Sequence, residues 1–232
     1  MIGQLIGARW RGDRGFFTAL AAATAIGVFV GFAPSYYLKG WYRAPAITPL
    51  VHVHGALFTS WIVLLIVQTS LVAAGRTDLH RRLGVAGAVL AGLMAAAAFE
   101  TAIQATRRGR IDHAFLLVPI GTVVIFPALV GAAIAYRRQP ALHKRLMLLA
   151  TFEILSAAVA RWPVVKTWST PAGFLAVTDL FLAAIVIYDL ATRRRINPAT
   201  LWGGLFLVAS QILRVQVGHT DAWLSVARWL TS

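Results

Sequence analysis

The chain of 232 residues contains no cysteine, which excludes disulfide bonds, thiolate metal ligands and thiol catalysis. Charged residues are scarce: they make up 13% of the chain, where a typical soluble domain has about a quarter. Walker loops and the G-x-G-x-x-G, H-E-x-x-H and G-x-S-x-G signatures are also missing. No motif therefore identifies an enzyme, and the sequence leaves open whether the protein is one.

Apolar sequence is abundant, at 59% hydrophobic residues. It forms continuous runs of about twenty residues or more, long enough to cross ~30 Å of hydrocarbon as helices. Continuous runs favour helices over barrel strands, whose residues alternate. We therefore predict an all-α polytopic transmembrane bundle, a single domain over residues 1–232. Its seven spans are expected at approximately 16–38, 50–74, 83–105, 111–136, 142–162, 173–192 and 199–218.

The net charge of +14 comes from basic residues placed between the apolar runs. This distribution argues against nucleic-acid binding and suits lipid headgroups at a bilayer surface. With the N-terminus inside, thirteen basic residues lie on the inner side and eight on the outer side. The bias predicts an N-inside, C-outside protein of the bacterial cytoplasmic (inner) membrane. Arg9, Arg11 and Arg14 precede a first run too long for a signal-peptide core, so we expect that run to remain as a span.

Four histidines mark a repeated two-helix unit. His54 and His113 open the second and fourth predicted spans, and they are 59 residues apart. His80 and His143 follow in similar Leu-His-basic-Arg-Leu stretches, 63 residues apart. Spans two–three and four–five are therefore predicted to be parallel copies. The first pair lies at the outer ends of its spans and the second pair at the inner ends.

Paired imidazoles on facing helices are one way in which a membrane bundle holds a b-type haem. We therefore predict His54 with His113, and His80 with His143, as cofactor-binding residues for haem b. Without haem, His54 and His113 are candidate ligands of a bound metal ion. The alternative interpretation places the histidines among the headgroups without a ligand. Candidate partners for haem propionates are basic residues near the span ends: Arg76, Arg107, Arg108 and Arg145.

Carboxylates within apolar spans are costly, and they are usually paired or face a functional cavity. We expect Asp189 to pair with Arg193 one turn away, and Asp179 to pair with Arg214. An outward-facing polar pocket is a second candidate site, for a small molecule, a proton or a metal ion. Its predicted residues are Glu100, Gln104, Glu153, Asp179 and Arg214.

Four stretches carry a resemblance that covers nearly the whole chain: "TPLVHVHGALFTSW", "GRTDLHRRLGVAGA", "HKRLMLLAT" and "RRRINPATLWGGL". With them the chain resembles an uncharacterised family of small seven-span bacterial integral membrane proteins. The four histidines resemble, more loosely, those of two-haem transmembrane b-type cytochromes. Those proteins pair histidines of the second and fourth, and of the third and fifth, core helices.

The cytochrome resemblance implies a haem-binding electron-transfer protein with a redox partner, which is our leading functional hypothesis. The first alternative is a non-haem binding or transport protein that takes a small-molecule ligand in the outward-facing pocket. The second is a structural or accessory membrane protein, whose polar residues only fix helix packing. The lipid bilayer is a partner in all three, and the sequence predicts no oligomeric state.

Overall fold

The computed structural model describes residues 2–167 and 170–232, with side chains from Asp13 onward. Arg9 and Arg11, two residues counted in the topology prediction, have side chains outside the described ones. Every regular element in the described ranges is a helix, which confirms the all-α prediction. The elements are α1 (Ile2–Phe32), the π-type turn η1 (Ala33–Tyr37), α2 (Pro49–Ala73), α3 (Thr77–Arg107), α4 (Leu117–Ala135), α5 (Pro140–Val159), α6 (Pro163–Lys166), α7 (Pro171–Arg193), α8 (Pro198–Val217) and α9 (Asp221–Thr231).

Six helical stretches are long and apolar enough to cross a membrane: Asp13–Tyr37, α2, α3, α4, α7 and α8. Together they indicate a multi-pass membrane protein. Five of the predicted spans agree with these stretches to within a few residues. The prediction for 111–136 begins too early, because α4 starts only at Leu117. His113 consequently lies in the loop before α4 rather than at the start of a helix.

The predicted span 142–162 corresponds to α5, which differs from the other long helices. It carries Lys144, Arg145 and Glu153, yet thirteen of its twenty residues are buried. It packs against α1, α4, α7 and α8. Because these neighbours surround it, α5 presents little surface to lipid. Its charged side chains form ion pairs with side chains of the neighbouring helices. That position explains how α5 carries three charged residues in its buried surroundings.

The helix starts follow local sequence rules. A proline occupies one of the first positions of α2, α5, α7 and α8, where its missing N–H costs nothing. The side chains of Thr48, Thr170 and Asn197 accept hydrogen bonds from the first free N–H groups of α2, α7 and α8. Gly75 and Gly109 adopt positive φ angles after α2 and α3, a conformation that glycine takes at little cost.

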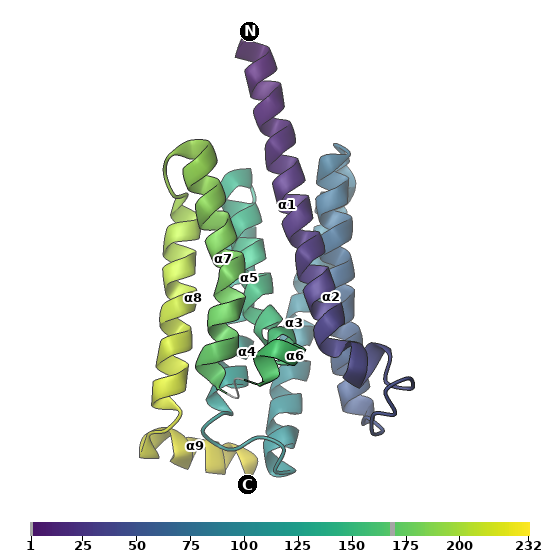
Figure 1. The fold of residues 1–232 in the computed structure, drawn as a ribbon, viewed down its shortest axis with the longest axis vertical. Helices are drawn as coiled ribbons and strands as arrows, with labels where there is room; N and C mark the ends of the chain where they lie inside the picture. The colour runs from purple at the N-terminus through teal and green to yellow at the C-terminus, as the bar shows by residue number, and fades with distance from the viewer. Residues whose placement is uncertain (1, 168–169) are drawn as a thin grey trace.

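Figure 1 shows the helices as a bundle of roughly parallel rods, with α9 lying across one end. We call this the α9 end and the opposite end the N-terminal end. Helices α2 and α3 form one antiparallel hairpin and α4 and α5 another, and α2 and α4 both start at the α9 end. The two histidine-bearing units therefore run in the same direction, as the repeat predicts.

The two hairpins meet across a packed core. Trp61 of α2 lies edge-on to Phe126 of α4, with ring centroids 5.0 Å apart. Its indole Nε1 donates to the Thr151 hydroxyl of α5 at 3.2 Å. Helix α1 approaches α5 very closely at Gly31, where an added Cβ would lie 2.3 Å from the Ala158 carbonyl oxygen. Glycine is required there because any side chain would push the two helices apart.

Candidate functional site

The structure brings together one of the two predicted histidine pairs. His80 and His143 are each the fourth residue of a helix, in α3 and α5 respectively. Their ring centroids lie 6.1 Å apart, and the ring planes are nearly perpendicular, at 88°. The equivalent positions in the two hairpins therefore place the two imidazoles against each other at the N-terminal end.

Hydrogen bonds orient this pair. The His143 Nδ1 atom lies 2.8 Å from the carbonyl oxygen of Ala133. A carbonyl only accepts, so Nδ1 carries a proton, and in the neutral form of the ring the lone pair is on Nε2. The Gln68 side-chain amide of α2 donates to the His80 carbonyl at 3.1 Å, which holds the first turn of α3.

Two buried polar atoms beside this pair lack good hydrogen bonds. The Gln68 backbone lies close to the His80 ring, but the His80 Nδ1 atom makes no hydrogen bond of normal geometry. The Gln68 Oε1 atom is also buried without a partner. We call Gln68, His80 and His143 the histidine cluster. Unsatisfied polar atoms are uncommon in a packed interior. Among the described residues two of the four such side-chain atoms lie here, and another is His54 Nδ1.

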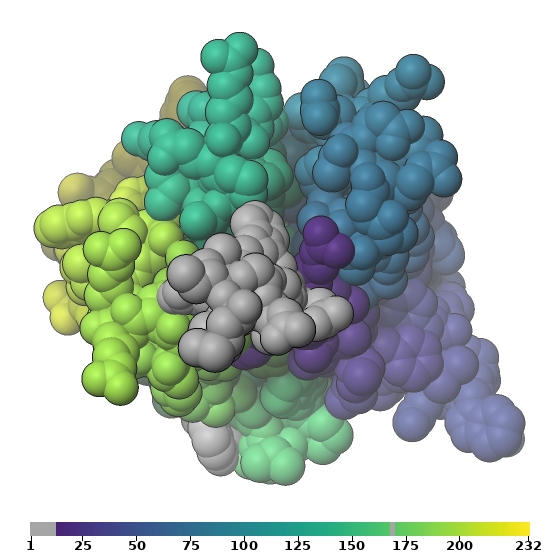
Figure 2. Space-filling view, turned by 90° about the horizontal axis from the view of Figure 1, so that it is seen from above, coloured from purple at the N-terminus to yellow at the C-terminus, as the bar shows by residue number. Residues whose placement is uncertain are grey.

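The geometry of the cluster suits a metal held between two imidazoles. Two metal–nitrogen bonds of ~2 Å place the ring centroids ~6 Å apart when both rings point at the metal. The observed 6.1 Å matches this separation. Figure 2, seen from the N-terminal end, shows a cleft between the α2–α3 turn (blue) and the α4–α5 turn (teal). The first turns of α3 and α5, which carry the two histidines, follow these turns.

The described residues place no further side-chain ligands for a bare metal ion near this pair. Within residues 2–167 and 170–232, no group of three or more His, Cys, Asp or Glu side chains is close enough to hold a metal. A haem brings four nitrogen ligands of its own, so it needs only two axial imidazoles from the protein. The donor set of the cluster therefore fits a haem iron better than a free metal ion.

The structure gives the other predicted pair different neighbours. The His54 ring of α2 stacks on Phe58, with centroids 4.2 Å apart. The His113 Nε2 atom lies 3.1 Å from the Thr231 hydroxyl of α9, and the His113 carbonyl accepts a hydrogen bond from Trp223 at 2.8 Å. Among the described residues, no ring contact joins His54 to His113.

A buried ion pair connects α5 with α8. Both carboxylate oxygens of Glu153 accept from Arg214, at 2.6 and 3.2 Å, and Glu153 is only 1% exposed. The expected Asp179–Arg214 pair is wrong: Asp179 accepts instead from the Gln211 amide at 3.2 Å. Arg214 turns toward α4 and α5 because Gly121 leaves room there, where a Cβ would lie 2.0 Å from the Arg214 Cδ atom.

A second buried ion pair connects α5 with α7 near the N-terminal end. Arg145 and Asp189 have side chains with 0% exposure. Asp189 accepts from Arg145 Nε at 3.2 Å and from a second guanidinium nitrogen, as well as from the Thr200 hydroxyl at 2.8 Å and the Asn197 N–H at 3.1 Å. The predicted partner Arg193 has its Nε atom 4.0 Å from an Asp189 carboxylate oxygen, so it contributes less to this pair than Arg145 does. Arg145 is therefore occupied, and our expectation that it pairs with a propionate is wrong.

The residues predicted to outline an outward-facing pocket divide into two groups: Glu153, Asp179 and Arg214 lie close together, apart from Glu100 and Gln104. Glu100 and Gln104 lie on α3, where Gln104 donates to Glu100 at 2.8 Å and accepts from Arg108 at 3.1 Å. Of the five predicted residues, Arg214 alone lines the cavity of about 360 Å³ at the α9 end. The sequence reasoning did not find its other lining residues, which include Phe115, Lys166, Phe174 and His219.

Comparison with known protein families, curated proteins and solved structures finds no match to this chain. The residues themselves therefore carry the functional assignment, through the histidine cluster at one end of the bundle and the cavity at the other.

Proposed function

We propose that the protein is a multi-pass membrane protein that binds one haem b between His80 and His143 and transfers electrons. The observation that carries this proposal is the separation of the two rings, 6.1 Å between centroids, on equivalent turns of two helices. When bound, the haem supplies reversible one-electron chemistry. If His80 and His143 both held the haem iron, the site would favour electron transfer over binding of an external ligand.

The protein residues around the two ligands have separate tasks. The Ala133 carbonyl accepts a hydrogen bond from His143 Nδ1, so Nε2 would be the atom that holds the haem iron, and the hydrogen bond would increase its basicity. Gln68 fixes the turn of α3 that carries His80. Arg81 and Arg82 follow His80 directly and are exposed, so they replace Arg145 as candidate partners of the propionates.

The proposal includes the topology that the basic residues predict. It has seven spans with the N-terminus inside the bacterial cytoplasmic membrane, and α5 is the span shielded by its neighbours. The histidine cluster then faces the cytoplasmic side, where a redox partner delivers or takes the electron. This arrangement is one half of the two-haem b-type cytochrome pattern that the four histidines resemble. A second haem at His54 and His113 stays a prediction, since the geometry supports it less.

Absorption spectroscopy tests the haem proposal. The protein is purified in detergent from cells supplied with haem, oxidised, and then reduced with dithionite. We expect a Soret band and sharp α and β bands on reduction. Replacing His80 or His143 by alanine should remove most of this spectrum, whereas His52→Ala and His219→Ala should leave it intact. A featureless spectrum, or haem bands that survive both cluster replacements, refutes the proposed site.

A further inference from the structure

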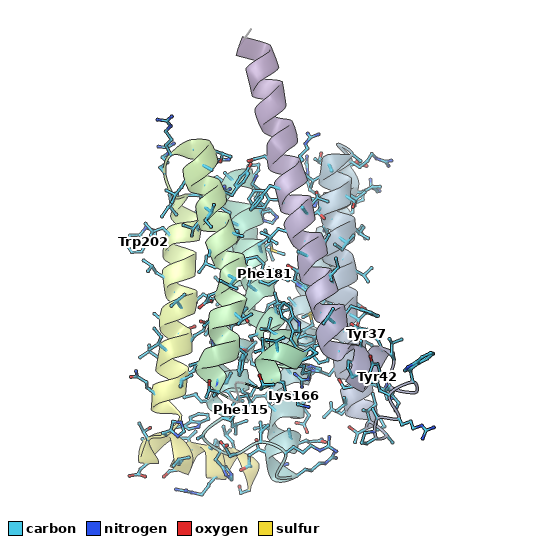
Figure 3. All side chains as sticks on the ribbon, viewed as in Figure 1. Tyr37, Tyr42, Phe115, Lys166, Phe181 and Trp202 are labelled. Atoms are coloured by element: carbon cyan, nitrogen blue, oxygen red, sulfur yellow. The ribbon has the colours of Figure 1, made fainter. Side chains whose placement is uncertain are left out.

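The cavity at the α9 end lies between the starts of α4 and α7, the end of α8 and the short helix α6. Its volume of about 360 Å³ falls within the range of pockets for small ligands, ~300–1,000 Å³. Figure 3 labels two of its lining residues, Phe115 and Lys166, at the α9 end of the bundle beside α6. It lies at the opposite end of the bundle from the histidine cluster and does not depend on the haem proposal.

The walls of this cavity are mainly apolar. Phe115 and Phe174 face each other as an edge-to-face pair with centroids 6.4 Å apart. Val118, Val165 and Val215 complete the apolar lining. Deeper in, Arg214 has its charge balanced by Glu153 and its guanidinium occupied by hydrogen bonds. The interior of the cavity therefore offers an apolar surface without a free charge.

The mouth of the cavity, in contrast, is rich in hydrogen-bond donors. Lys166 is exposed and has no ion pair in the described part of the chain. His219 lies beside the mouth, and so does the N-terminus of α7 at Thr170, where the helix dipole is positive. The acidic residue here, Asp112, uses one carboxylate oxygen to cap the Phe115 N–H at 2.6 Å. Asp112 keeps its negative charge, so the group that the mouth favours is a single acceptor or anion held at Lys166.

We infer that this cavity binds a small amphipathic acid, with its apolar body against the wall formed by the two phenylalanines and its carboxylate at Lys166. Such an acid reaches the site from the bilayer as a fatty acid or from water as a short aromatic acid. Both sources offer the same chemistry: one negative charge on an apolar body. A cavity of this volume limits the length of apolar body that it can bury, and a lipid phase does not.

The test is a chain-length series measured by titration calorimetry on the full chain in lipid nanodiscs. Linear carboxylates from acetate to dodecanoate form one arm, phenyl-substituted short acids the second, and the matching alcohols the third. Within the first arm, affinity should rise by up to about fourfold for each methylene that the cavity buries and then reach a plateau. Tight binding confined to the linear arm indicates a source in the bilayer, and binding confined to the phenyl arm a source in water.

Variants distinguish binding in the cavity from partitioning into the surrounding lipid. Val215→Trp fills part of it and should move the plateau to shorter chains, whereas Phe174→Ala enlarges it and should move the plateau to longer ones. Lys166→Gln should lower the affinity for the acids by up to about fivefold and leave the affinity for the alcohols unchanged. Lys39→Gln, at a partly exposed lysine in the α1–α2 connection, is the control and should change the affinity of neither the acids nor the alcohols.

Two outcomes overturn the inference. The first is an affinity that rises steadily to the longest chain and is identical in both cavity variants, as partitioning into lipid requires. The second is equal binding of acids and alcohols together with no effect of Lys166→Gln. Because two variants alter the cavity in opposite directions, failure of one to fold leaves the test intact.

Discussion

Removal of Arg145 should destabilise the protein strongly. In Arg145→Met, Asp189 loses both guanidinium hydrogen bonds and keeps the Thr200 hydroxyl and the Asn197 N–H as donors. Both side chains of the pair have 0% exposure, so water cannot replace the lost partner. A buried ion pair that loses one member costs about 3–5 kcal/mol. In a chain of this size each kcal/mol lowers the unfolding temperature by about 2–4 °C, which gives a decrease of about 6–20 °C.

Thermal unfolding in detergent measures this decrease in unfolding temperature. Two further variants test whether the loss of the ion pair causes it. Arg145→Met combined with Asp189→Leu removes both charges, and it should recover most of the lost stability because no carboxylate is left buried alone. Arg193→Met is the control: its guanidinium lies 4.0 Å from Asp189 and is 27% exposed. It should cost at most about 1 kcal/mol. An Arg145→Met protein that unfolds at the wild-type temperature, or a double variant no more stable than the single one, refutes this reasoning.

Further predictions address packing and topology. Gly121→Ala should lower stability by about 1–3 kcal/mol in the same unfolding assay, because the new Cβ would lie 2.0 Å from Arg214. Gly131→Ala in the same helix meets nothing within 4 Å and should be neutral or stabilising by up to about 1 kcal/mol; equal losses in both would contradict the account. The chain has no native cysteine, so single introduced cysteines report the topology. Ser232→Cys should react with an impermeant maleimide in spheroplasts, and Gln139→Cys should react only after lysis. The reverse pattern excludes an N-inside topology.

The sequence predicts the helices well because a membrane imposes one dominant requirement. A run of about twenty apolar residues crosses the bilayer only as a helix, so composition alone locates α2, α7 and α8 to within a few residues. The same rule explains the error at 111–136. Ile111 to Leu116 are compatible with a span by composition, yet they form the connection to α4.

Which side chains face each other is a different question, because spacing along a helix fixes depth but not rotation about the axis. Asp179 and Arg214 lie at compatible depths, but Arg214 turns toward Glu153 through the gap at Gly121. The histidine pair of α3 and α5 could be predicted because the repeat places both residues at the same turn of equivalent helices. Lys166 and His219 gave no signal, since residues in connections follow no periodicity.

The most direct test of the haem site is the low-temperature electron paramagnetic resonance spectrum of the oxidised protein. The rings of His80 and His143 are inclined at 88°, so axial ligation by this pair predicts a low-spin ferric signal. That signal should have the strong anisotropy of nearly perpendicular imidazole planes, and it should disappear in His143→Ala. A haem-loaded protein with a high-spin signal, or with a low-spin signal that persists in His143→Ala, would contradict the assignment.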